Sequence, residues 1–169
     1  KGMLKSAIRD NNPILFVESQ IMYNVKGVVP KDEYLVPLGK ADIKRAGDQV
    51  TIVTWGPMLY DALKAADMLA AEKISAEVVD LRSLVPLDME TVLASVRKTG
   101  RCVVASHCVD IGSFTGEIAS RIMAEAFDSL DAPVLRVGAK DGIAPQAYSL
   151  EDAFLPHDRD IVAAVKKLL

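Results

Sequence analysis

The hydrophobic pattern is clearest between residues 49 and 80, where strand-like and helix-like segments alternate. Residues 49–54 (QVTIVT) are β-branched and nearly all apolar, which is typical of a strand buried on both faces. Within 58–72, apolar residues recur at spacings of three and four, which predicts an amphipathic helix of about four turns. A second apolar run follows at 76–80. A connection of this length between two such strands predicts a parallel pair with a right-handed crossover.

The same alternation continues to the end of the chain. Asp88 is expected to cap a helix that stops at Gly100, because aspartate favours the first position and glycine the last. The predicted strands are 49–54, 76–80, 101–106 and 133–137, with a short hairpin-like edge strand at 41–45. The further predicted helices are 114–127 and about 158–169. This order predicts an α/β fold, a doubly wound and mostly parallel sheet of about five strands.

The first 40 residues differ from the rest. Residues 2–10 form a short helical pattern, and 13–18 (PILFVE) have the composition of a buried strand, but neither has a partner nearby in sequence. Residues 19–40 carry glycines and prolines among apolar side chains, which indicates an ordered linker. We therefore expect 1–18 to be the tail of a preceding domain, 19–40 a linker, and 41–169 the main domain. The chain, which starts Lys1-Gly2, is expected to be part of a longer protein.

Composition narrows the classes of function. Half of the 169 residues are hydrophobic and 25% are charged, with a net charge of −3 and both signs mixed along the chain. This balance disfavours a surface for nucleic acid or anionic membrane. No apolar run approaches the ~20 residues that a membrane-spanning helix needs. The two cysteines, Cys102 and Cys108, do not suggest a disulfide framework, which suits a reducing intracellular compartment.

Few segments carry recognisable chemistry. The turn 55–58 (WGPM) matches neither the dinucleotide fingerprint nor the phosphate loop. The loop 112–116 (GSFTG) precedes a helix and offers backbone donors, so a stand-alone module that binds a small anion is one alternative. His107 and Cys108 adjoin, but adjacent residues seldom face each other, which favours a loop pair over a nucleophilic pair. His157 is expected to cap or flank a helix. These spacings predict no metal site.

Several motifs together resemble one family. They are DNNP at 10–13, VPLGKA at 36–41, VDLRSLVPLD at 79–88, LDAP at 130–133 and LED at 150–152. As a set, spread over the whole chain, they are similar to the beta subunit of thiamine-diphosphate-dependent 2-oxoacid dehydrogenases, which act on pyruvate, branched-chain 2-oxoacids or acetoin. The resemblance implies that residue 41 onward is a transketolase C-terminal-like domain and that 1–18 end a pyrimidine-binding domain. The sequence at 106–108 (SHC) departs from the acidic or glycine residues common there.

The resemblance also implies a function for the parent protein. It would decarboxylate a 2-oxoacid such as pyruvate oxidatively and pass the acyl group to lipoyl, in bacterial cytoplasm or the mitochondrial matrix. Thiamine diphosphate and magnesium would be held by the upstream domain and the alpha subunit. The present region is therefore expected to have no catalytic, cofactor-binding or metal-binding residue, and to be inactive alone.

The same resemblance assigns this region to assembly. The expected partners are the alpha subunit, a second beta subunit, and the subunit-binding domain of the dihydrolipoyl acyltransferase. The implied docking groups are Asp131 and the chain-terminal carboxylate, which Leu169 carries if the natural terminus is intact. Two anionic groups suit a basic partner, because they steer its approach and fix its orientation. A transketolase or deoxyxylulose-phosphate synthase parent is the nearer alternative, but we find no convincing phosphate-binding set in this region.

Overall fold

A five-stranded sheet forms the centre of the protein in the computed structural model, which describes residues 1–169. The strands are β1 (Asp42–Arg45), β2 (Val50–Thr54), β3 (Ala76–Asp80), β4 (Cys102–Val109) and β5 (Leu135–Ala139). Their order across the sheet is β1-β3-β2-β4-β5, with β1 antiparallel to β3 and all other pairs parallel. The predicted doubly wound, mostly parallel fold is confirmed.

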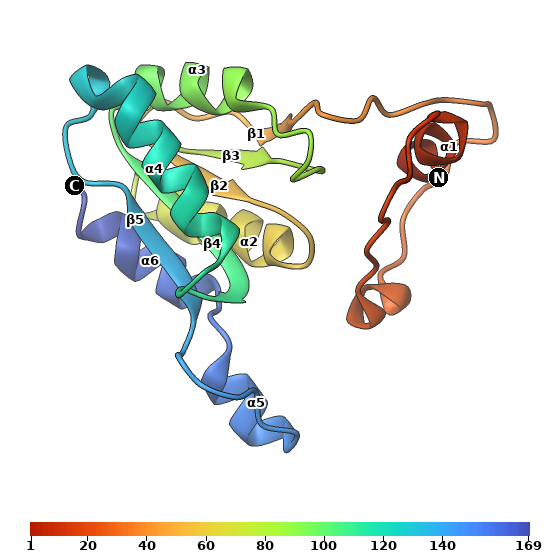
Figure 1. Ribbon diagram of the computed structural model, residues 1–169. Helices are drawn as coiled ribbons and strands as arrows, with labels where there is room; N and C mark the ends of the chain where they lie inside the picture. The colour runs from red at the N-terminus through yellow and green to blue at the C-terminus, as the bar shows by residue number, and fades with distance from the viewer.

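Helices cover both faces of the sheet (Figure 1). The helices α2 (Met58–Ala71) and α6 (Asp158–Lys166) pack on one face, and α3 (Met89–Thr99) and α4 (Phe114–Ala126) on the other. All residues of β2 are buried. Ile52 belongs to the hydrophobic core between the sheet and helices α2 and α6, and Val53 to the core between the sheet and helices α3 and α4. The two-sided burial predicted for this strand follows from its central place in the sheet. No helix combines the length and the apolar character that crossing a membrane requires.

Both ends of α3 follow local sequence rules. The Asp88 carboxylate accepts hydrogen bonds from the backbone N–H of Thr91 at 3.2 Å and of Ala41 at 3.0 Å. Gly100 closes the helix with φ of 69°, a left-handed conformation that glycine adopts without the steric cost of a Cβ. The predicted cap and the predicted stop are both confirmed.

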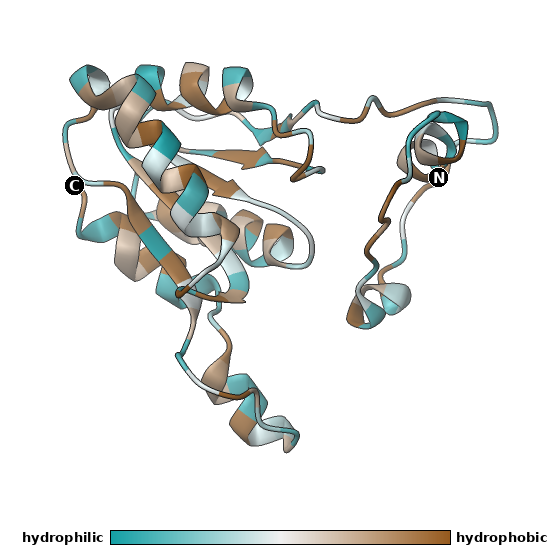
Figure 2. Cartoon of the chain, viewed as in Figure 1, coloured by the Kyte–Doolittle hydropathy of each residue, from teal (hydrophilic) through white to brown (hydrophobic).

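The first 40 residues lie largely away from the sheet (Figure 1). The helix α1 (Gly2–Arg9) matches the prediction, and a 3₁₀ helix, η1 (Gln20–Asn24), follows. The strand predicted at 13–18 is wrong, because this segment pairs with no other strand and is exposed, with Leu15 90% and Val17 81% accessible. Figure 2 shows an apolar stretch lying open between α1 and η1. A strand-like sequence becomes a strand only when a neighbour supplies the hydrogen-bond ladder.

Three other local predictions need correction. β4 extends to Val109, which pairs with Ala139 of β5, so His107 and Cys108 lie in a strand and not in a loop. β1 pairs with β3 and does not form a hairpin with the strand that follows it. The segment before the last helix forms a separate helix, α5 (Tyr148–Phe154), which projects from the domain (Figure 1). A short 3₁₀ turn, η2 (Phe127–Ser129), follows α4.

Candidate functional site

The predicted docking residues lie at the amino edge of the sheet, where β4 and β5 begin. Arg101 directly precedes β4, and its Nε donates a hydrogen bond to the carbonyl of Leu168 at 2.9 Å. The backbone N–H of Asp131, which precedes β5, donates to the carbonyl of Gly100 at 2.8 Å. The fold therefore brings Asp131 and the end of the chain together around Arg101. We call Arg101, Asp131, Leu168 and Leu169 the amino-edge site.

The same arginine forms the ion pair of this site. Its Nη2 lies 3.5 Å from Oδ2 of Asp131, with the Arg101 side chain 29% and the Asp131 side chain 60% exposed. An exposed pair of this kind contributes only ~0.2–1 kcal/mol, so its main effect is on geometry and on local charge. Asp131 keeps much of its carboxylate open to solvent. Sequence reasoning missed Arg101, because its contacts come from segments far away in the chain.

The exposed fractions differ sharply at the end of the chain. Leu168 is 7% exposed and belongs to the core that includes α2 and α6, whereas Leu169 is 52% exposed. The N–H of Leu168 donates to the carbonyl of Val165 at 2.9 Å, which continues the last turn of α6. The backbone is therefore fixed up to Leu168, and Leu169 follows it directly at the surface.

Gly100 lies directly against the Asp131 carboxylate. A Cβ at this position would come within 2.6 Å of Oδ2 of Asp131. The left-handed backbone also disfavours any residue with a side chain. Gly100 therefore has two roles, to end α3 and to leave room for Asp131.

The backbone at Arg101 is fixed by hydrogen bonds from two elements. Its carbonyl accepts from the N–H of Thr51 in β2 at 2.9 Å and from the hydroxyl of Thr99 in α3 at 3.1 Å. The hydroxyls of Thr51 and Thr99 are themselves 2.8 Å apart, and both residues are buried. The arginine thus extends from a rigid part of the sheet.

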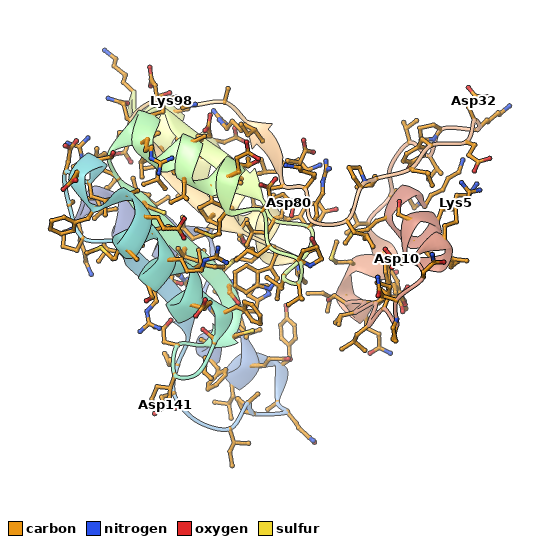
Figure 3. The ribbon with its side chains drawn as sticks, turned by 45° about the horizontal axis from the view of Figure 1, so that its top comes forward. Lys5, Asp10, Asp32, Asp80, Lys98 and Asp141 are labelled. Atoms are coloured by element: carbon orange, nitrogen blue, oxygen red, sulfur yellow. The ribbon has the colours of Figure 1, made fainter.

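A buried carboxylate holds α3 against the sheet beside this site. Glu77 of β3 is 1% exposed and accepts hydrogen bonds from the Ser95 hydroxyl at 2.6 Å and from the Lys98 ammonium. Burial alone would raise the pKa of Glu77, but the hydrogen bonds from Lys98 and Ser95 outweigh it and lower that pKa. Glu77 is therefore charged at neutral pH and fully partnered. Figure 3 shows Lys98 at the end of the domain opposite Asp141, which follows β5.

The carboxyl edge of the sheet holds a different set of groups. Nε2 of His107, in β4, lies 3.7 Å from Oδ2 of Asp61, in the first turn of α2. The nearby His107 imidazole lowers the pKa of Asp61 against the opposing effect of burial. Cys108 is exposed, and the pairing of β4 with β5 is irregular between Ala105 and Val109. The imidazole of His107 lies near Asp61 and makes no hydrogen bond to Cys108. The other cysteine, Cys102, is buried, which raises the pKa of its thiol.

Two further sequence candidates have local roles. His157 precedes α6, as expected for a residue that flanks a helix start, and its N–H donates to the Asp160 carboxylate at 2.9 Å. Its Nε2 lies 2.8 Å from the carbonyl of Asp152. In the loop 112–116, the hydroxyls of Ser113 and Thr115 are 2.5 Å apart at the start of α4. Anion binding by this loop stays a prediction.

Comparison with known proteins places the fold in a family. Residues 39–161 match the sequence model of the family described as transketolase, C-terminal domain. The chain belongs to this family. A solved structure described as a split gene transketolase, an inactive beta4 tetramer, is similar with a TM-score of 0.73 and 36% identity over 86% of this chain and 46% of that chain. The 2-oxoglutarate:ferredoxin oxidoreductase from Magnetococcus marinus shares the fold, with a TM-score of 0.51 and 18% identity over 76% of this chain and 19% of that one.

Curated relatives match along the whole chain. The pyruvate dehydrogenase E1 component subunit beta of Bacillus subtilis is 44% identical over 100% of this chain and 52% of its own length. The protein of the same name from Rhizobium meliloti is 46% identical over 98% of this chain and 36% of its length. The 2-oxoisovalerate dehydrogenase subunit beta of Bacillus subtilis is 41% identical over 99% of this chain and 52% of its own length. The chain thus spans about half or less of these relatives, and the resemblance drawn from its motifs is confirmed.

Proposed function

We propose that this chain is the C-terminal part of a 2-oxoacid dehydrogenase beta subunit. The parent enzyme decarboxylates a 2-oxoacid such as pyruvate oxidatively and transfers the acyl group to lipoyl, in bacterial cytoplasm or the mitochondrial matrix. Within it, this region serves association with the alpha subunit and a second beta subunit, and docking of the acyltransferase. The whole-chain similarity to pyruvate and 2-oxoisovalerate dehydrogenase beta subunits supports this assignment.

The observation that carries the docking role is the meeting of Asp131 and the chain end at Arg101. The Asp131 side chain is 60% exposed and Leu169 is 52% exposed, so both positions are accessible to a partner. They lie at the amino edge of the parallel strands, whereas ligands of open α/β sheets bind outside the carboxyl edge. A surface at the amino edge suits a macromolecular partner. The partner we propose is a basic subunit-binding domain, because two carboxylates at a fixed spacing attract and orient cationic side chains.

The subunit-association role is supported by the exposed apolar side chains of the first 40 residues. Leu15, Val17, Val28 and Val29 are each at least 65% exposed, although they belong to the most apolar class of side chains. Large apolar side chains that are exposed together on a soluble protein often mark an interface. We propose that these residues are covered by the rest of the subunit and by the neighbouring subunits of the assembled enzyme.

The residues of this chain do not fit a magnesium-bound diphosphate. No three His, Cys, Asp or Glu side chains lie together in a way that could hold a metal ion. The turn 55–58 after β2 lacks the lysine and the serine or threonine with which phosphate loops hold phosphate and magnesium. We therefore derive no catalytic step from these residues, and thiamine diphosphate, with magnesium, is proposed to bind elsewhere in the parent enzyme. Calorimetric titration tests this, since tight cofactor binding by the 169 residues alone would contradict it.

A binding experiment tests the docking role. The assembled dehydrogenase containing this subunit is titrated with the subunit-binding domain of its dihydrolipoyl acyltransferase at low, physiological and high salt. Binding that weakens as salt rises is expected, because exposed charge pairs are screened. Absence of binding at low salt would remove the docking proposal.

A transketolase parent is the second candidate, and the similarity to the split gene transketolase favours it. Activity of the assembled enzyme separates the two. Reductive acylation of a lipoyl domain with a 2-oxoacid supports the dehydrogenase, whereas transfer of a two-carbon unit between sugar phosphates supports the transketolase.

A further inference from the structure

We propose that Arg101 is a positioning residue, which holds the Asp131 carboxylate relative to the backbone of Leu168 in the arrangement that a basic partner recognises. This inference rests on the proposed docking function and adds to it a residue that does not itself attract the partner. A cation inside a site for a cationic partner is unfavourable by charge alone. Its presence is explained by what its guanidinium joins.

The guanidinium contacts two segments that lie far apart in the sequence. Nε donates to the Leu168 carbonyl at 2.9 Å, and Nη2 lies 3.5 Å from the Asp131 carboxylate. The two contacts use different nitrogens of one rigid plane, so they fix a direction as well as a distance. The backbone of Arg101 is held in turn by Thr51 and Thr99. One side chain therefore holds the Asp131 carboxylate relative to the Leu168 carbonyl, in addition to the hydrogen bond from the Asp131 N–H to Gly100 and the burial of Leu168.

The position of Arg101 leaves its partner carboxylate available. Asp131 remains 60% exposed while paired, whereas the Arg101 side chain is 29% exposed. The arginine contacts the carboxylate from the protein side, and the open side of Asp131 faces solvent. A cationic side chain of the partner can then share this carboxylate, whose two oxygens accept several hydrogen bonds.

A positioning role and a purely electrostatic role predict opposite changes in the affinity for a basic partner when Arg101 is replaced by glutamine. Arg101→Gln removes a positive charge and makes the site more anionic. If the site acts only through its net charge, this variant binds a basic domain more tightly at low salt. If Arg101 acts by positioning, binding weakens despite the added negative charge. The reason is that the Asp131 carboxylate is no longer held in place relative to the Leu168 carbonyl.

The experiment measures the dissociation constant of the acyltransferase's subunit-binding domain for the assembled enzyme by calorimetry. We expect Arg101→Gln to bind about three- to fivefold more weakly than the parent, which is the scale of an exposed ion pair. Arg101→Lys keeps the charge but replaces the planar fork with a single ammonium, and is expected to bind more weakly as well. Arg97→Gln is the matched control, because this variant loses the same charge at a different place. The Arg97 side chain donates a hydrogen bond to the Glu125 carbonyl, at 2.9 Å. This control is expected to bind as well as the parent or slightly better.

A double-mutant cycle measures the coupling between Arg101 and Asp131 in the binding free energy. A general loss of stability at Arg101 would not produce such a coupling. In an Asp131→Asn background, Arg101→Gln is expected to have a smaller effect than alone, because the ion pair is already lost. Thermal denaturation and subunit assembly are checked for each variant, and Arg101→Lys decides the matter if the glutamine variant does not assemble.

The possible results separate the two proposals. No binding by the parent enzyme overturns the docking function itself. Binding by the parent together with equal or tighter binding by Arg101→Gln or Arg101→Lys leaves the docking function in place and overturns the positioning role. Weaker binding by both, with an unaffected Arg97→Gln, supports it.

Discussion

Gly100 and Asp131 fit together so closely that a Cβ on residue 100 would lie 2.6 Å from Oδ2 of Asp131. The glycine also has φ of 69°, which other residues rarely adopt. One position thus ends α3, turns the chain toward Arg101 and accommodates the carboxylate that we propose for docking. The stability of the domain and the geometry of the site are linked at this glycine.

Gly100→Ala is therefore expected to destabilise the protein by about 1–2 kcal/mol, because a left-handed alanine is strained and its methyl group displaces Asp131. Urea denaturation measures the change in the free energy of unfolding. Gly27→Ala is the matched control, since no atom lies within 4 Å of its added Cβ and its φ is not positive. Equal effects of the two substitutions would contradict the role of Gly100.

Asp88→Ala is expected to cost about 1 kcal/mol or more, because it removes the cap of α3 and the partner of the Ala41 N–H. Burial raises the pKa of Asp88, but hydrogen bonds from Ala41 and Thr91 outweigh it, so its folded pKa lies below the ordinary value of 3.8. A depressed pKa means that the charged cap stabilises the fold above the unfolded-state pKa, and that this contribution disappears as pH falls through the folded pKa.

The measurement for Asp88 is the difference in unfolding free energy between the parent and Asp88→Ala across the acid range. The difference is expected to be largest at neutral pH and to shrink below about pH 4. Asp88→Asn keeps an acceptor oxygen and serves as the control with a smaller loss. A difference that does not change with pH would show that the charge of Asp88 is unimportant.

Asp80 is expected to show the opposite pH dependence. Burial at the end of β3 raises its pKa above the ordinary value of 3.8, and the hydrogen bond from the Arg82 N–H only partly offsets this. A raised pKa means that the stability contributed by protonated Asp80 is present below the unfolded-state pKa and is lost as pH rises through the folded pKa. Asp80→Asn, which keeps the acceptor oxygen, should therefore gain stability relative to the parent between about pH 4 and pH 7. Thermal denaturation at several pH values measures this gain, and a constant difference would contradict it.

Asp131→Ala is expected to weaken acyltransferase docking mainly through its salt-dependent part, since the lost contact is an exposed charge. A short extension beyond Leu169 should have the same effect if a carboxylate on Leu169 is the second docking group, because it moves that group away from the buried Leu168. Calorimetry at low and high salt measures both variants. Asp128→Ala, in the η2 turn just before Asp131, is a control that loses the same charge. Unchanged affinity at low salt in both test variants would remove the assignment of these groups.

Local patterns succeeded where the sequence itself carries the constraint. The run 50–54 is apolar on both faces, so burial on both sides was predictable from its composition. The ends of α3 were predictable because Asp88 and Gly100 satisfy backbone groups within a few residues of themselves. The family motifs extended this knowledge to the fold of the whole domain.

The failures occurred where a distant segment decides the outcome. Residues 13–18 have a strand-like composition, but they form no strand, since no neighbouring strand lies beside them. His107 was expected in a loop, but Val109 pairs with Ala139 and keeps this stretch in β4. Strand pairing is a contact between remote parts of the chain, so it cannot be read from a single segment.

The sequence by itself determined the alternation of strands and helices, the limits of α3 and the membership of the family, from which the docking role of Asp131 and Leu169 is a prediction. Only the tertiary structure decided that Arg101 lies between Asp131 and the backbone of Leu168, with its Nε on the Leu168 carbonyl and its Nη2 toward Asp131. The physical reason is that periodicity and capping act over a few residues. The site depends instead on where β4, β5 and α6 end in space, which is fixed by packing of the two cores around the sheet.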